Sequence, residues 1–179
     1  SPVVELEQTA FGSEQIEAFA QGRTWECFGP NFDGTRTHTR TPVIAGGRMR
    51  FLDRITELRA YGGPWKRGYL RAELDLHADD WFLDGHFKND PCMPGTLMFE
   101  GCLNAMAFMM TGLGFTIQRD GWRFQPVKDE PFQLRCRGQA TPKARLLVTE
   151  IFVEEIIAGP IPTLYADLLC TIDGLKAFH

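Results

Sequence analysis

The segment from Leu97 to Met110 most constrains the fold, because it is long and almost wholly apolar: LMFEGCLNAMAFMM. Its only two polar side chains, Glu100 and Asn104, are four residues apart, which places them on one face of a helix. Burying an ionised carboxyl without a partner is costly, so such a group is paired, neutral or used in chemistry. The segment therefore predicts a buried central helix that carries one carboxyl of special interest.

The rest of the chain reads mainly as strands and turns. Leu70, Ala72 and Leu74 alternate with charged residues, the period of a strand with one buried face. Residues 48–58 have a mixed pattern that fits either a helix or the start of a strand, and residues 61–68 are predicted to form a turn. Further strands are predicted over residues 131–138, 144–157 and 162–178. One apolar helix with antiparallel strands and no βαβ alternation predicts an α+β fold, with the helix packed against a curled sheet.

The first 39 residues are expected to be an N-terminal extension with short helices, followed by the main domain at residues 40–179. Ser13 is expected to cap a helix over residues 14–21 that Gly22 ends, and residues 24–28 form another helical turn. The polar run at residues 31–42 reads as a linker.

Charge and cysteine content exclude several classes of protein. A net charge of −4 and a pI near 5.6 show no excess of positive charge that would attract nucleic acid or an anionic membrane. The two polar residues in the apolar helix argue against a membrane span. The cysteines are odd in number and form no CxxC motif, so neither a disulfide framework nor a metal site is expected, and a reducing cytoplasm is the expected location. These residues are Cys27, Cys92, Cys102, Cys136 and Cys170.

A second group of chemically capable residues precedes the helix in the segment DGHFKNDPCMPG, at residues 84–95. Pro94 and Gly95 lead into a helix whose first amides are unsatisfied and point outward, which makes an oxyanion hole feasible. Removal of a proton next to a carbonyl needs a base, donors for the enolate oxygen and an acid. His86, the Gly95 amide and Glu100 would supply these in that order. The alternative is that Glu100 is a structural carboxylate satisfied by Asn104 or a backbone amide.

Residues 85–101, GHFKNDPCMPGTLMFEG, resemble the signature of the 3-hydroxyacyl-[acyl carrier protein] dehydratases. The shared features are His86 with Phe87, a PxMPG motif, and an acidic residue fourteen positions after the histidine. The similarity runs from about Arg40 to Phe178, and residues 135–155 and 165–178 resemble the 3-hydroxydecanoyl dehydratase/isomerase branch. The amino-acid sequence as a whole is most similar to dehydratase domains of polyunsaturated fatty acid and related polyketide-like synthases.

This resemblance implies a hotdog fold, in which a curved antiparallel sheet wraps around the central helix. It also implies an active site between two hotdogs, as a homodimer or with a second hotdog domain, so that His86 works with Glu100 of the neighbour. His86 would remove the C2 proton of a (3R)-3-hydroxyacyl thioester, the Gly95 amide would hold the carbonyl, and Glu100 would release the hydroxyl as water. The product is a trans-2-enoyl thioester. No cofactor is implied, because the substrate arrives on the phosphopantetheine arm of an acyl carrier protein.

The sequence departs from the family pattern at three positions. Asn104 stands where the family often has glutamine that hydrogen-bonds the acid. Glu100 stands where the decanoyl branch has aspartate, which leaves isomerase activity open. Thr96 replaces a cysteine of that branch, and its hydroxyl either binds a water in the site or caps the helix.

The carrier protein is expected to contact a local basic patch, for which the candidates are Arg135, Arg137, Lys143 and Arg145 on two neighbouring strands. The alternative is that these residues form a solvated strand face. Two other functions stay open at this point. One is a non-catalytic hotdog that serves in docking or dimerisation. The other is a hotdog thioester hydrolase, which does not require His86.

Overall fold

The structure is a computed structural model that describes residues 2–6, 8–83, 93–131, 133, 135 and 140–179. Its α-helices are α1 (Ser13–Ala20), α2 (Thr24–Phe28) and α3 (Gly95–Gly112), and its short 3₁₀ helices are η1 (Pro30–Thr37), η2 (Gly47–Met49) and η3 (Trp81–Leu83). Its strands are β1 (Arg54–Arg59), β2 (Tyr69–Asp75), β3 (Leu146–Ile157), β4 (Thr163–Ile172) and β5 (Leu175–Phe178).

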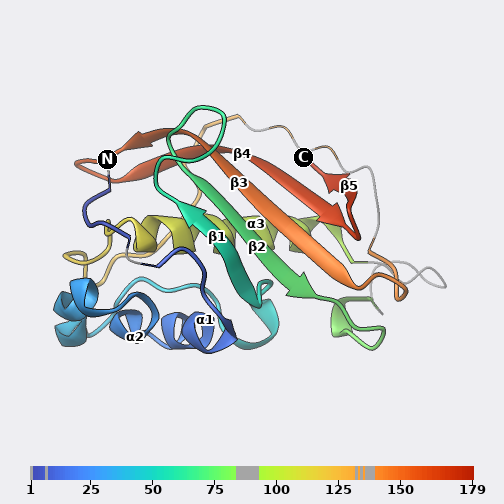
Figure 1. The fold of residues 1–179 in the computed structure, drawn as a ribbon, viewed down its shortest axis with the longest axis horizontal. Helices are drawn as coiled ribbons and strands as arrows, with labels where there is room; N and C mark the ends of the chain where they lie inside the picture. Colours follow the sequence, from blue (N-terminus) through green and yellow to red (C-terminus); the bar gives the residue numbers. More distant parts are fainter. Residues whose placement is uncertain (1, 7, 84–92, 132, 134, 136–139) are drawn as a thin grey trace.

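Within the described residues, the five strands form one antiparallel sheet in the order β1-β2-β3-β4-β5. Helix α3 crosses one face of this sheet and packs against β2, β3 and β4, while α1 and α2 lie on the β1 side (Figure 1). This arrangement confirms the predicted α+β class. Glu100 lies on this central helix and is half-buried.

Strand β2 shows why the alternating pattern predicts the sheet correctly. Leu70, Ala72 and Leu74 are buried, and Ala72 pairs with Thr149 of β3. The intervening residues of β2 are half-buried on the opposite face. The predicted strands at 144–157 and 162–178 are confirmed as β3 and as the β4–β5 hairpin, and the mixed segment at 48–58 contains β1.

The strand predicted over residues 131–138 lies largely outside the described residues. Arg135, which is described, exchanges two backbone hydrogen bonds with His179, at 2.8 and 3.0 Å. Residue 135 therefore lies beside the end of the chain, next to β5. The strand itself stays a prediction.

The N-terminal segment packs into the same core as the central helix. The ring of Phe108 in α3 lies 5.1 Å from Phe11, 5.6 Å from Phe19 and 4.9 Å from Phe28, measured between ring centroids. Phe11 also exchanges two backbone hydrogen bonds with Ile55, which covers the open edge of β1. The N-terminal residues thus hold the second half of α3, and the boundary at residue 40 stays a prediction.

The predicted linker is wrong in its first half, where the chain forms η1. Phe32 and Thr35 are buried there, and the Phe32 ring stacks on Phe28 at 4.8 Å. The prediction failed because the segment is mostly polar, and polar composition suggests a linker. A single buried aromatic side chain such as Phe32 is enough to anchor a short helical segment to a core.

The short helices of the N-terminal region are confirmed, but the predicted cap of the first one is wrong. Helix α1 has Gly12 at its N-cap position, and Ser13 is already helical. The side chain of Gln15 accepts a hydrogen bond from the Gly12 amide at 3.1 Å, so glutamine supplies the local partner expected from serine. Gly22 follows the helix with a φ of +84°, as its predicted role requires.

Candidate active site

Helix α3 begins at Gly95, with Pro94 as its N-cap residue. The amides of Leu97 and Met98 donate to the Pro94 carbonyl at 3.0 and 3.3 Å. No described residue accepts a hydrogen bond from the amide of Gly95 or Thr96. Within the described residues, these two backbone donors at the positive end of the helix dipole are available to an oxygen atom.

Thr96 does not cap the helix. It is the second helical residue and is exposed, and within the described residues no side-chain hydrogen bond caps α3. A capping hydroxyl must come from the residue before the first helical position, which here is proline. The capping interpretation of Thr96 is wrong, and the alternative that its hydroxyl binds a water stays a prediction.

Glu100 lies in the second turn of α3 and is half-buried. In the described part of the chain, its carboxylate forms no hydrogen bond or ion pair. Asn104 is 4% exposed, and its side-chain oxygen accepts a hydrogen bond from the backbone amide of Phe51 at 3.1 Å. No hydrogen bond joins Asn104 to Glu100, so the structure does not show the structural pairing that the sequence left open.

The Phe51 segment lies tightly against the turn of α3 that carries Glu100. A Cβ atom added at Gly101 would lie 3.3 Å from the Cβ of Phe51, which is closer than ordinary packing. The Phe51 ring contacts Phe82 of η3 at 5.9 Å between centroids. The helical turn at 100–104 is therefore fixed by close backbone approach on one side and by the Asn104 hydrogen bond.

The other half of the predicted site lies outside the described residues. This applies to Gly85, His86 and Phe87, which follow η3 in the sequence, and to Arg137. The chain leaves the described part after Leu83 and re-enters it at Met93, which is buried and whose amide donates to the Ala140 carbonyl at 2.8 Å. The distance between His86 and Glu100 stays a prediction.

One face of α3 is apolar and incompletely covered, a feature that the sequence analysis missed. Phe99, Leu103, Met106 and Met110 are half-buried, whereas Met98 and Phe108 are buried. The spacing of these four residues by four, three and four positions is the signal that would have revealed one stripe on a helix. We call these four residues the α3 stripe, and Glu100 lies beside it.

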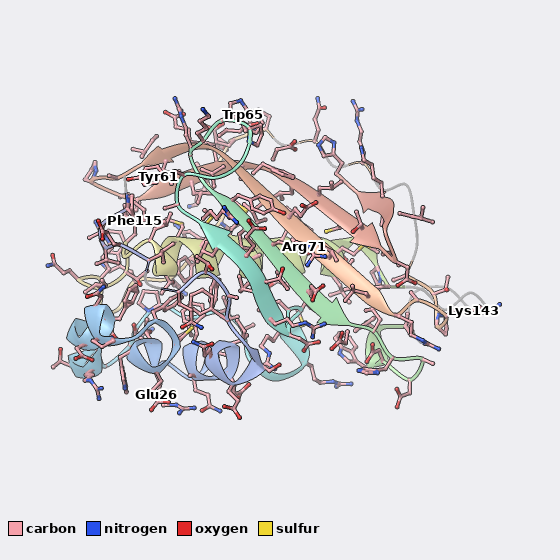
Figure 2. The ribbon with its side chains drawn as sticks, in the orientation of Figure 1. Glu26, Tyr61, Trp65, Arg71, Phe115 and Lys143 are labelled. Carbon is pink, nitrogen blue, oxygen red and sulfur yellow. The ribbon has the colours of Figure 1, made fainter. Side chains whose placement is uncertain are left out.

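The basic residues are only partly grouped as predicted. Arg135, Lys143 and Arg145 are exposed, but Lys143 lies in a turn and Arg145 directly precedes β3, at the end of the sheet shown in Figure 2. The Asp173 carboxylate accepts hydrogen bonds from the amides of Arg145 and Leu146 at 3.2 and 2.9 Å. The predicted placement on a strand is wrong for Lys143, which lies in a turn, while Arg145 is the residue directly before β3.

Two further findings concern metal ligands and membrane-spanning helices. Among the described residues, no three histidine, cysteine or acidic side chains are grouped as metal ligands. In the same part of the chain, no helix is both long and apolar enough to cross a membrane.

A comparison with known families matches residues 44–179, more than half of the chain, to the FabA-like domain. The chain belongs to this family of hotdog proteins, which includes 3-hydroxyacyl-[acyl carrier protein] dehydratases and isomerases. Membership supports dehydratase chemistry of the fatty acid type, in which a lyase removes water from its substrate.

The hydrogen bond between Asn104 and Phe51 is expected to stabilise the site turn. Replacing Asn104 by alanine leaves a buried amide without its acceptor, which should lower the free energy of unfolding by about 2 kcal/mol. Urea denaturation of the two proteins measures this loss. Asn104→Leu, which fills the space without an acceptor, should lose a similar amount. If leucine restores full stability, the cavity and not the hydrogen bond is responsible.

Proposed function

We propose that this protein dehydrates 3-hydroxyacyl thioesters carried on an acyl carrier protein, forming trans-2-enoyl thioesters. The observation that carries the proposal is Glu100, a half-buried carboxyl with no partner among the described residues, on a helix in which the amides of Gly95 and Thr96 have no acceptor among those residues either. The family membership supports the same class of reaction.

Each site residue is assigned the step of the dehydration that its chemical group can perform. The Gly95 amide, at the positive end of α3, is suited to hold the thioester oxygen as negative charge develops on it. Glu100 gives its proton to the departing hydroxyl, which leaves as water. His86, assigned from its spacing to Glu100 in the sequence, takes the C2 proton as a base.

A second hotdog completes the proposed site. The α3 stripe supports this, because four large apolar side chains remain half-buried in the single chain beside Glu100. Apolar surface of this kind gains free energy when a partner covers it. The partner is either an identical chain, whose His86 would act with the Glu100 of this chain, or a neighbouring hotdog domain, which would supply a histidine of its own.

The chain is further proposed to act as a dehydratase domain of a polyunsaturated fatty acid or polyketide-like synthase. The similarity of residues 40–178 to such domains supports this context. The exposed Arg135, Lys143 and Arg145 would contact an acidic carrier domain, together with Arg137. The phosphopantetheine arm of that carrier brings the substrate, and the proposed chemistry needs no other cofactor.

The function is tested by incubating the purified chain with a 3-hydroxyacyl thioester of pantetheine and following the products by mass spectrometry. Enoyl thioester is expected, and His86→Ala should reduce its rate by about 10³-fold, as expected for loss of a general base. His77→Ala, which changes an exposed histidine, should leave the rate unchanged. Circular dichroism confirms that each variant is folded.

The same assay separates the alternatives. A thioester hydrolase would release free acid and thiol, and a docking or dimerisation domain would give no turnover. A non-conjugated double bond, detected by NMR of the product, would add isomerase activity. Full activity in His86→Ala would show that the base is assigned wrongly.

A further inference from the structure

Two cysteines that are far apart in the sequence are in contact beneath the candidate site. Cys102 lies on α3 and Cys170 on β4, and their sulfur atoms are 3.5 Å apart. Both are 0% exposed, and both are free thiols. The hydroxyl of Thr149 on β3 lies 3.6 Å from the sulfur of Cys170. The proposed mechanism uses none of these groups.

We propose that Cys102 and Cys170 form a redox-active dithiol, which a small peroxide oxidises to a disulfide that joins α3 to β4 and turns the candidate site off. The linear spacing of the cysteines gives no hint of this pair. It exists only because α3 packs across β4 at this point.

The oxidation proceeds in two balanced steps. The thiolate of Cys170 attacks one oxygen of hydrogen peroxide, so that an S–O bond forms, the O–O bond breaks, and hydroxide leaves and takes up a proton as water. The sulfur of Cys102 then attacks the resulting sulfenic acid, an S–S bond forms, and the oxygen leaves as a second water. Peroxide is reduced by two electrons, which the two thiols supply.

The surroundings of the two sulfurs suit these roles. The hydrogen bond with Cys102 lowers the pKa of Cys170, and Thr149 adds to this effect against the opposing effect of burial. The hydrogen bond with Cys170 and then burial raise the pKa of Cys102, which keeps it a thiol. Cys170 is therefore the nucleophile, and Cys102 resolves the intermediate.

Closure of the disulfide would disturb the site turn. The two sulfurs must approach from 3.5 Å to about 2.05 Å, and the side chains and the contact between α3 and β4 must adjust at Cys102 to allow it. Glu100 is two residues away on the same turn, and Gly101 between them already lies against Phe51. This part of the inference rests on the proposed function, since a displacement near 1 Å is enough to lower a catalytic rate by about 100-fold.

Access is the step that limits the reaction, because neither sulfur is exposed. A small neutral oxidant reaches them when the contact between helix and sheet opens transiently. Cys27 provides a matched comparison in the same protein. It is 1% exposed, burial raises its pKa, and no other described cysteine lies within hydrogen-bonding reach of its sulfur.

The test treats the purified chain with hydrogen peroxide and maps its peptides without reduction. A peptide pair linked through Cys102 and Cys170 is expected, while Cys27 remains alkylatable after unfolding. Cys102→Ser and Cys170→Ser should each abolish the linked pair, and Cys27→Ser should retain it. If Cys102 and Cys170 stay reduced while Cys27 is oxidised, or if either pairs with another cysteine instead, the proposal is overturned.

The effect on activity is a separate measurement. Peroxide should lower the dehydration rate by at least about 10-fold in the wild-type chain, and dithiothreitol should restore it. Cys170→Ser should keep its rate under the same treatment. A linked pair with no change in rate would refute the switch while the dithiol stands. Absence of dehydration before any oxidation would instead count against the proposed function, and peptide mapping would still decide the dithiol.

Discussion

Replacing Glu100 by glutamine is expected to lower the dehydration rate by about 10³-fold, because the amide has no proton to give to the departing hydroxyl. The change replaces one carboxyl oxygen with an amino group and keeps the shape of the side chain. Since the carboxylate has no hydrogen bond or ion pair within the described residues, the free energy of unfolding should change little. Steady-state rates and urea denaturation of the same preparations measure the two quantities.

The matched control is Glu154→Gln, the same chemical change on an exposed residue of β3. This variant should keep the wild-type rate. A fall in rate with Glu154→Gln similar to that with Glu100→Gln would show that general electrostatics, rather than proton transfer at residue 100, is being measured. An unchanged rate with Glu100→Gln would refute the assignment of the acid.

Mixing the two inactive variants tests whether the site is shared between identical chains. A mixed dimer of His86→Ala and Glu100→Gln contains one site with both groups intact. Random exchange should restore roughly a quarter of the wild-type rate, because half of the dimers are mixed and each of these has one intact site. No restoration would mean that both groups come from one chain or that the partner hotdog is not a copy.

The second large effect is expected at Gly68, where alanine should lower the free energy of unfolding by about 3 kcal/mol. Gly68 precedes β2 with a φ of +143°, a region that side chains rarely adopt. An added Cβ would lie 2.5 Å from the Cε of Met109 and 3.0 Å from a methyl group of Val153. Met109 is fully buried, so relief of this contact requires its flexible end to repack within the core, and the positive φ strains any side chain at residue 68 in addition.

Gly174→Ala separates strain in the backbone from contact with the core. Gly174 lies in the β4–β5 turn with a φ of +86°, and nothing lies within 4 Å of an added Cβ. Its loss should be about 1 kcal/mol, the cost of a left-handed conformation alone. Thermal or urea unfolding of both variants measures the difference. Equal losses of unfolding free energy in the two variants would show that the close contact between Gly68 and Met109 of α3 does not add to the cost of Gly68→Ala.

The strengths and failures of the sequence predictions have identifiable causes. Alternation at residues 70–74 and the apolar run at 97–110 predicted β2 and α3 correctly, because burial on one face or all round imposes a period that the side chains must follow. The cap at Ser13, the cap at Thr96 and the linker around Phe32 were wrong. Each of these three features depends on a single local contact, and a periodic sequence pattern carries no information about such a contact.

Local side-chain chemistry was enough to predict the helix and most of the strands. The folded chain alone decided which distant residues meet. Asn104 turns to the Phe51 amide instead of Glu100, the N-terminal phenylalanines join the core of the central helix, and Cys102 comes to rest against Cys170. The physical reason is that periodicity specifies which face of an element is buried, whereas the partner on that face is selected by packing between elements far apart in the sequence.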